Sequence, residues 1–296
     1  MPDVVYDALV GASTNLRQVT NSSFDAHLDF MNARQSGSPT ISDQFLSSGS
    51  PEAQLTTVDI GGFLTAFGTV GNQTDGANIL VPYQKRQSGG TFKGGATNMT
   101  VGGIATCPVQ LVPAQVTAPR QGSPSASGHL HFLSVDGVTV PFVESVNQSL
   151  AAQAFDAMYG LGPCFINGTK VPRQVGFTVT FGVGLSEKQH YDGAVWPSDI
   201  FLETFDPVIE IQVEDFDQIS SIATGGVITS CSAYLRKRLS GSTYSADTNA
   251  VHVKFSFASG MIVPQALSAS ETKHGNAAIR LVGRTLVASY ASTVTT

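Results

Sequence analysis

The amino-acid sequence predicts a mainly β protein, built from two tandem antiparallel β-sandwich or barrel modules that each carry one short helix. Two observations predict this fold. The composition favours strands and turns, because the chain has 30 Gly and 14 Pro while only 13% of its residues are charged. Short stretches also recur in the same order along the two halves of the chain, as expected after an internal duplication.

The composition narrows the class of protein. The chain has 296 residues, 42% of them hydrophobic, which is enough to bury the cores of two domains. It has no long apolar run and no basic region of a signal peptide at its start, so we expect no membrane partner. The formal net charge of −6 disfavours tight binding of nucleic acid. Three widely spaced cysteines predict reduced core thiols rather than disulfides or a zinc site.

Three collinear matches support the duplication. The first pairs residues 42–60 with residues 198–216 without a gap, through Ser42, Asp43, Phe45, Leu46, Pro51 and Asp59 on Ser198, Asp199, Phe201, Leu202, Pro207 and Asp215. The second pairs residues 83–92 with residues 235–244. The third pairs residues 128–141 with residues 251–264 and requires an extra segment in the first copy.

These matches predict the domain boundaries. Residues 1–35 would form an N-terminal arm, and residues 36–160 would form the first module, with an inserted loop and a linking helix. Residues 161–296 would form the second module. The inserted loop is predicted at residues 113–128, which are rich in Pro, Gly and Ser. The linking helix is predicted at residues 149–161, whose apolar residues have helical spacing.

Local patterns predict the elements inside each module. Pro51 and Pro207 are predicted to begin strands, where a missing N–H is tolerated. Asp59 and Asp215 are predicted to cap short helices at the N-terminus. Those helices would cover the residues 60–67 and 216–222.

Alternation of apolar and polar residues predicts three further strands. Ile209, Ile211 and Val213 form the apolar face of one. Residues 174–183 form a second strand, and residues 251–257 form a third with His252 on its solvent face.

The candidate metal site is a pair of histidines. His129 and His131 lie two residues apart on a predicted strand, so both rings face the same side, as in metal-binding β-barrels. Only Asp136 or Glu144 is close in sequence as a third ligand, and a solvent-facing strand explains the pair more simply. No nucleophile elbow or phosphate-binding loop is present. We therefore predict no metal, no catalytic residue and no cofactor, and we expect that the protein is not an enzyme.

The candidate contact site is a basic pair that recurs before an aromatic residue. Each copy is predicted to form an exposed hairpin, and Arg and aromatic side chains are enriched in protein interfaces. The predicted contact residues are Lys85, Arg86, Phe92, Lys237, Arg238 and Tyr244.

These features together resemble the tail tube proteins of tailed bacteriophages, some of which fuse two tube modules in one chain. The resemblance lies in the duplicated β-sandwich, the helix and hairpin of each copy, the N-terminal arm and the acidic balance, over about residues 35 to 290. It implies a virion structural protein, assembled in the host cytoplasm, whose partners are further copies of itself and other virion proteins. Homotrimeric rings of six modules would stack into a tube, and DNA would pass through without tight binding.

Two alternatives remain open at the level of the sequence. A major capsid protein with two jelly rolls per chain also uses a duplicated β module, although each jelly roll needs eight strands. The short helix after Pro51 and Pro207 favours the tube module over this alternative. A metal-dependent enzyme of the cupin type would depend on His129 and His131, and metal analysis would distinguish it.

Overall fold

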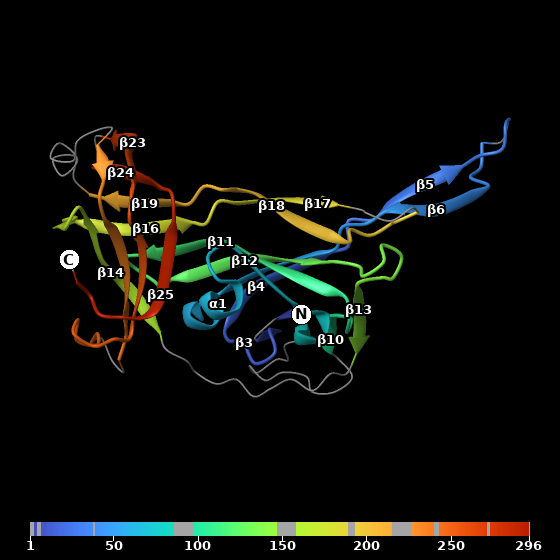
Figure 1. The fold of residues 1–296 in the computed structure, drawn as a ribbon, viewed down its shortest axis with the longest axis horizontal. Coiled ribbons are helices and arrows are strands. Elements are labelled where there is room, and N and C mark those ends of the chain that lie inside the picture. Colours follow the sequence, from blue (N-terminus) through green and yellow to red (C-terminus); the bar gives the residue numbers. More distant parts are fainter. Residues whose placement is uncertain are drawn as a thin grey trace.

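The computed structural model of the chain describes residues 3–4, 7–37, 39–85, 98–146, 158–188, 193–214, 226–239, 243–270 and 273–295. Throughout these residues the strand pairs are antiparallel, and α1 (Ile60–Phe67) is the single α-helix. The predicted mainly β fold is therefore confirmed (Figure 1).

The strands divide between two halves of the chain. The first half contains β1 (Asp3–Val4), β2 (Ala8–Val10), β3 (Asn15–Leu16), β4 (Val19–Asp25), β5 (Asp29–Ala33), β6 (Asp43–Ser48), β7 (Glu52–Thr57), β8 (Asn72–Asp75), β9 (Ile79–Lys85), β10 (Asn98–Gly103), β11 (Pro108–Pro119), β12 (Ser125–Phe132) and β13 (Phe142–Val146), with a 3₁₀ turn η1 (Gly76–Asn78). The second half contains β14 (Tyr159–Ile166), β15 (Thr169–Lys170), β16 (Gln174–Thr180), β17 (Val183–Lys188), β18 (Asp199–Phe205), β19 (Val208–Val213), β20 (Val227–Ile228), β21 (Cys231–Lys237), β22 (His252–Phe257), β23 (Gly260–Ser270), β24 (Lys273–Gly283) and β25 (Leu286–Ser292).

One sheet runs through both halves. This long sheet has ten strands in the order β20-β23-β24-β19-β16-β11-β12-β7-β4, with β8 paired to β11. A six-stranded sheet in the order β13-β10-β9-β2-β3, with β1 on β9, packs against its first half. A five-stranded sheet in the order β15-β14-β21-β22-β25 packs against its second half. The chain is therefore two β-sandwiches that share one continuous layer.

The long sheet is apolar on one face and polar on the other. Residues that pair directly across its strands share a face, and the buried face includes Leu130 opposite Leu111 and Ile209 opposite Leu281. Both smaller sheets cover this face: Phe255 of β22 contacts Phe177 of β16, and Phe142 of β13 contacts Phe24 of β4. The opposite face carries Gln54, Thr56, Ser125, Ser127, His129, His131, Thr117, Thr178, Thr180, Glu210, Gln212 and Arg280. An antiparallel sheet with one solvated face has this alternation.

The two halves follow the same order of strand pairing. The pairs β4–β7, β7–β12, β11–β12, β8–β11, β9–β10 and β10–β13 of the first half recur as β16–β19, β19–β24, β23–β24, β20–β23, β21–β22 and β22–β25. The register shifts recur as well: β4 shifts between Val19 and Asn21 where β16 shifts between Gln174 and Gly176. The paired strands of one half thus have counterparts at the same places in the pairing order of the other.

This pairing order corrects the third sequence match. Residues 128–141 begin in β12, whereas residues 251–264 begin in β22, and β22 is equivalent to β10 rather than to β12. The dipeptide Val263-Pro264 is equivalent to Val112-Pro113 of β11, just before the register shift that β11 and β23 share. The similarity that suggested the match was strand and turn vocabulary, and no inserted segment is needed.

Three further expectations require correction. The predicted N-terminal arm is largely part of the body, since β2 and β3 pair in a sheet and Val10 and Leu16 are fully buried. The predicted loop at residues 113–128 is instead most of the β11–β12 hairpin, because Pro113 lies at a register shift where a strand tolerates a missing N–H. Of the predicted linking helix, residues 149–157 lie outside the described part, and Tyr159–Leu161 begin β14.

The helix prediction for the first copy is confirmed. The Asp59 carboxylate accepts a hydrogen bond of 2.9 Å from the Gly62 N–H, which caps α1, and a second of 3.2 Å from the Arg17 N–H. The equivalent prediction at residues 216–222 falls outside the described residues.

The three predicted strands are present as β16, β19 and β22. His252 is an exception to the predicted pattern, because it is fully buried rather than solvent-facing. Its Nδ1 accepts from the Lys237 N–H at 3.1 Å, and its Nε2 lies 3.0 Å from the Ala246 carbonyl oxygen. These two partners allow the ring to be buried.

Replacing Asp59 with Ala should lower the free energy of unfolding by about 1–2 kcal/mol, because α1 loses its N-cap. Urea denaturation measures the change. Asp59→Asn is the control, since Asn caps as well as Asp and should retain most of the stability. An equal loss in both variants would contradict a capping role.

Candidate functional site

The predicted contact hairpin is described mainly in its second copy. Arg238 and Tyr244 form an isolated bridge, and the guanidinium carbon of Arg238 lies 5.7 Å from the centroid of the Tyr244 ring. A Cβ on Gly160 of β14 would lie 2.6 Å from the Tyr244 hydroxyl, so the ring packs back onto its own chain. Tyr244 keeps 38% of its surface exposed, and Lys237 ends β21. The predicted anchor is therefore partly used within the chain.

The first copy of this hairpin cannot be compared in the same way. Lys85 ends β9, where its backbone pairs with Asp3. Arg86 and Phe92 lie outside the described residues. The described ends of the two copies, Lys85 of β9 and Lys237 of β21, belong to different smaller sheets.

His129 and His131 share the polar face of β12, as predicted, and each binds a different carboxylate. His129 Nδ1 lies 2.5 Å from Glu52 Oε1, and His131 Nδ1 lies 3.1 Å from Glu187 Oε1. Within the described part of the chain, no three His, Cys, Asp or Glu side chains are placed to hold a metal ion. The proposed third ligand Asp136 accepts hydrogen bonds inside its own loop, from the N–H groups of Val138 and Thr139 among others.

The histidines set the protonation of their partners. The hydrogen bond from His129 lowers the pKa of Glu52 from 4.5 to about 2, against the opposing effect of burial. The hydrogen bond from His131 likewise lowers the pKa of Glu187, and Ser50 Oγ donates a further bond of 2.6 Å to this carboxylate. Glu187 belongs to β17 of the second half, so this cluster joins the two halves.

Two hairpins extend beyond the long sheet. The first ribbon consists of β5, β6 and the segment 39–42, and it continues the β4–β7 pair. The second ribbon consists of β17, β18 and the segment 193–198, and it continues the β16–β19 pair. Figure 1 shows both ribbons directed toward the same end of the molecule, with the first ribbon projecting farthest.

The second ribbon is attached to the first half of the same chain. The Gly49 N–H donates to the Val195 carbonyl at 2.9 Å, and the Val195 N–H donates to the Gly137 carbonyl at 2.8 Å. The only tryptophan, Trp196, is 4% exposed and packs edge-on against Phe142 at 6.0 Å. A Cβ on Gly49 would lie 2.3 Å from this indole, so the ring needs a glycine beneath it.

The first ribbon projects beyond the body of the molecule (Figure 1). Its large apolar side chains are exposed, at 47% for Ile41, 50% for Phe45, 52% for Phe30 and 55% for Met31. Exposed apolar groups concentrated on one projecting element indicate an interaction surface. The sequence contained a signal for it, since Phe45 was part of the first repeated block.

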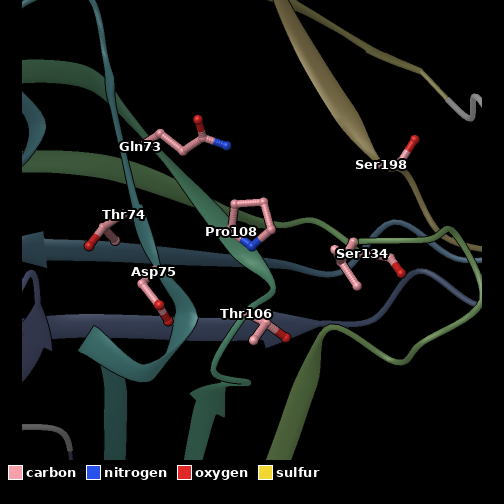
Figure 2. Close-up of a pocket in the computed structure, with 8 residues that line it drawn as sticks. Gln73, Thr74, Asp75, Thr106, Pro108, Ser134 and Ser198 are labelled. Carbon is pink, nitrogen blue, oxygen red and sulfur yellow. The ribbon is translucent and has the colours of Figure 1, made fainter.

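A polar hollow of about 510 Å³ lies between residues of the first half and Ser198 of the second ribbon (Figure 2). Its lining residues are Gln73, Thr74, Asp75, Thr106, Pro108, Ser134, Val135 and Ser198. The Asp75 carboxylate already accepts from the Ala77 N–H at 2.8 Å. The lining residues carry hydroxyl, amide and carboxylate groups, which can form hydrogen bonds with a polar ligand.

The two halves meet through strand pairing between β11 and β16. Gln115 to Pro119 pair with Thr180 to Gly176, which makes the ten strands one sheet. One end of this sheet is formed by β4, the counterpart of β16, and the other end includes β23, the counterpart of β11. In the described part of the chain, β4 pairs only with β7, and Leu267–Ser270 of β23 pair only with β24. Sequence reasoning missed both open edges, because a sequence does not state which strands pair.

Replacing Glu52 with Gln should reduce the loss of stability on acidification. The pKa of Glu52 is depressed in the folded state, so its ionised form stabilises the fold above about pH 4.5, and this contribution is lost as the pH falls toward 2. Thermal midpoints at about pH 6 and about pH 3 should therefore differ less in the variant than in the wild type. Glu203→Gln, on the exposed side of β18, is the control, and equal acid sensitivity of Glu52→Gln and wild type would contradict the His129 contact.

No helix in the described part of the chain is both long and apolar enough to cross a membrane. No protein-family model matches the sequence, and no curated protein matches it. The open edges, the ribbons and the polar sheet face of this chain are therefore what indicate its function.

Proposed function

We propose that this chain is the subunit of a hollow tube, as in the tail tubes of bacteriophages, and that its long sheet continues from chain to chain until it closes as a barrel. The observation that carries the proposal is the pairing of β11 with β16. In this pairing β16, which is the counterpart of β4 in the second half, joins β11 of the first half. A duplicated module that makes such a contact once within the chain can make it again between chains.

The two open edges have the right identity for this repetition. β4 holds the position relative to β7 that β16 holds relative to β19, including the register shift. β23 holds the position relative to β24 that β11 holds relative to β12. The β4 edge of one chain and the β23 edge of the next therefore correspond to the two sides of the existing junction.

The equivalence predicts the register between chains. Within a chain, Thr117 lies opposite Thr178. The equivalent residues are Ser268 of β23 and Ser23 of β4, which would lie opposite each other between chains. Neighbouring pairs follow by the antiparallel pattern, with Leu267 opposite Phe24 and Ser270 opposite Asn21.

Closure explains both the edges and the faces of the long sheet. A head-to-tail contact gives a ring when its rotation closes, and a closed barrel leaves no open strand edge. The smaller sheets would lie outside, and the polar face would line the lumen. This face carries mostly hydroxyl and amide side chains, with Glu210 opposite Arg280. DNA would find few cations to bind there and would pass without tight attachment.

The resemblance to tail tubes supplies the further parts of the proposal. Three chains would place six modules in each ring, rings would stack into the tube, and other virion proteins would bind its ends. The basic hairpins at Lys85 and Lys237 remain candidate contacts between subunits. The protein would act as a structural component of the virion, with no catalytic role and no cofactor.

The proposed junction predicts a cross-link between chains. Ser23→Cys combined with Ser268→Cys should give covalent dimers and larger species with a short bismaleimide, because the two positions would face each other across the junction. Denaturing gel electrophoresis measures the products. Cys107, Cys164 and Cys231 are at most 2% exposed, so the native thiols should contribute little.

The control is Thr117→Cys with Thr178→Cys, which should cross-link within one chain and leave the product monomeric. Electron microscopy of the same protein should show hollow tubes or rings. Only monomeric products from the Ser23 and Ser268 pair would contradict the junction. Closed shells in the micrographs would instead favour the double jelly-roll capsid protein, and stoichiometric bound metal would favour the cupin-type enzyme.

A further inference from the structure

We propose that the first ribbon of one chain docks on the second half of the neighbouring chain, at the place equivalent to where the second ribbon docks within its own chain. The partner is a second copy of this chain. The inference rests on the proposed ring, since it assumes the junction between β4 and β23, and it adds a second contact to that junction.

The two ribbons are equivalent position by position. β6 and β18 pair with the preceding strand in the same register, so that Phe45 corresponds to Phe201. Both ribbons shift register once, between Asp29 and Phe30 in the first and between Gly184 and Leu185 in the second. By this register Asn32 corresponds to Glu187.

The direction of docking follows from the junction. The second ribbon belongs to the half that supplies β16, and it contacts the half that supplies β11 through Glu187 with Ser50 and His131. The first ribbon belongs to the half that supplies β4. If β4 pairs with β23 of a neighbour, the first ribbon must run over that neighbour's second half in the same way.

The receiving position in the second half has a different shape from that in the first. Gly49, which leaves room for Trp196, is equivalent to Phe205. Trp196 corresponds to Thr40 of the first ribbon, because each lies two residues before the aligned serines Ser198 and Ser42. Within the chain, the large Trp196 of the second ribbon packs over the small Gly49. Between chains, the small Thr40 of the first ribbon would pack over the large Phe205. The exchange conserves the fit between ribbon and receiver, and it prevents the two ribbons from occupying each other's place.

The receiving surface of the second half is also more apolar than that of the first half. His131 is equivalent to Val282, which pairs with Met261 at 55% exposure. Val287, the neighbour of the position equivalent to Phe142, is 56% exposed. The loop Val135–Pro141 has no counterpart, since only Arg284 and Thr285 separate β24 from β25. By their strand pairs, Met261 lies on the polar face of the long sheet and Val287 on the outer face of the five-stranded sheet, so this end of the second half has exposed apolar side chains on both faces where the first half has a histidine and a loop.

The apolar ribbon and the apolar receiver match each other. Phe30, Met31 and Phe45 are at least half exposed in the single chain, as are Met261 and Val287. Apolar groups in the centre of an interface are what makes a contact between subunits stable. A neighbouring copy is the one partner for which the pairing of β11 with β16 already specifies the geometry.

A cross-link designed from the equivalence tests the docking. Ser50 and Glu187 touch within the chain, so the equivalent residues Asp206 and Asn32 should lie together between chains. Both are exposed, so N32C and D206C should leave the fold intact, as thermal unfolding would verify. With a short bismaleimide the double variant should shift from monomer to dimer and larger species. Each single variant should lose this shift.

The matched control is S50C with E187C, which should cross-link within the chain and remain monomeric. If S23C with S268C links chains but N32C with D206C does not, the ribbon docking is overturned while the proposed ring stands. If neither pair links chains, both are overturned. Links from both pairs support the docking and its place beside the ring junction.

Discussion

The antiparallel pairing of β11 with β16 is the interaction on which the rest of the structure depends. It joins two five-strand sets into one ten-stranded sheet and sets the register of one half against the other. Side chains reinforce it, since Phe181, which follows β16, lies 6.4 Å from Phe63 of α1 and 6.5 Å from Phe255 of β22. The second ribbon is placed over the first half by the same register. Without this pairing, the chain would be two sandwiches with no defined relation between their edges.

A wide sheet with two open edges creates a problem that closure solves. Unpaired strand edges expose rows of N–H and C=O groups, which invite uncontrolled association unless they are covered. The edge strand β4 (Val19–Asp25) contains no proline, and five of its seven residues, Thr20–Ser23 and Asp25, are small or polar. Such an edge is suited to controlled pairing with a strand of matching register. The solvated polar face and the covered apolar face then decide which side of the closed sheet faces inward.

The sequence predicted the local features well and the long-range ones poorly, for a physical reason. Asp59 was identified as an N-cap and Ile209, Ile211 and Val213 as a buried strand face, because these signals depend on neighbouring residues. Residues 113–128 of the β11–β12 hairpin were predicted as a loop because they are rich in Pro, Gly and Ser, and only the shifted register shows how a strand accommodates Pro113. The histidine pair was placed on the correct face, but Glu187 is too distant in sequence to be recognised as a partner. The open edges depend on pairing alone and leave no mark in local composition.

Fusion of two similar halves in one chain has a consequence that two separate copies would not share. Identical modules would make every contact in the ring interchangeable, whereas fused halves can diverge at matched positions. The exchange of Gly49 and Trp196 for Phe205 and Thr40, and of His131 for Val282, makes the contact within a chain chemically different from the one proposed between chains. The contact within the chain forms during folding and can be polar and hydrogen-bonded. The contact between chains must draw separate molecules together, for which exposed apolar surface is the appropriate driving force. Divergence of this kind would fix the alternation of first and second halves around a ring.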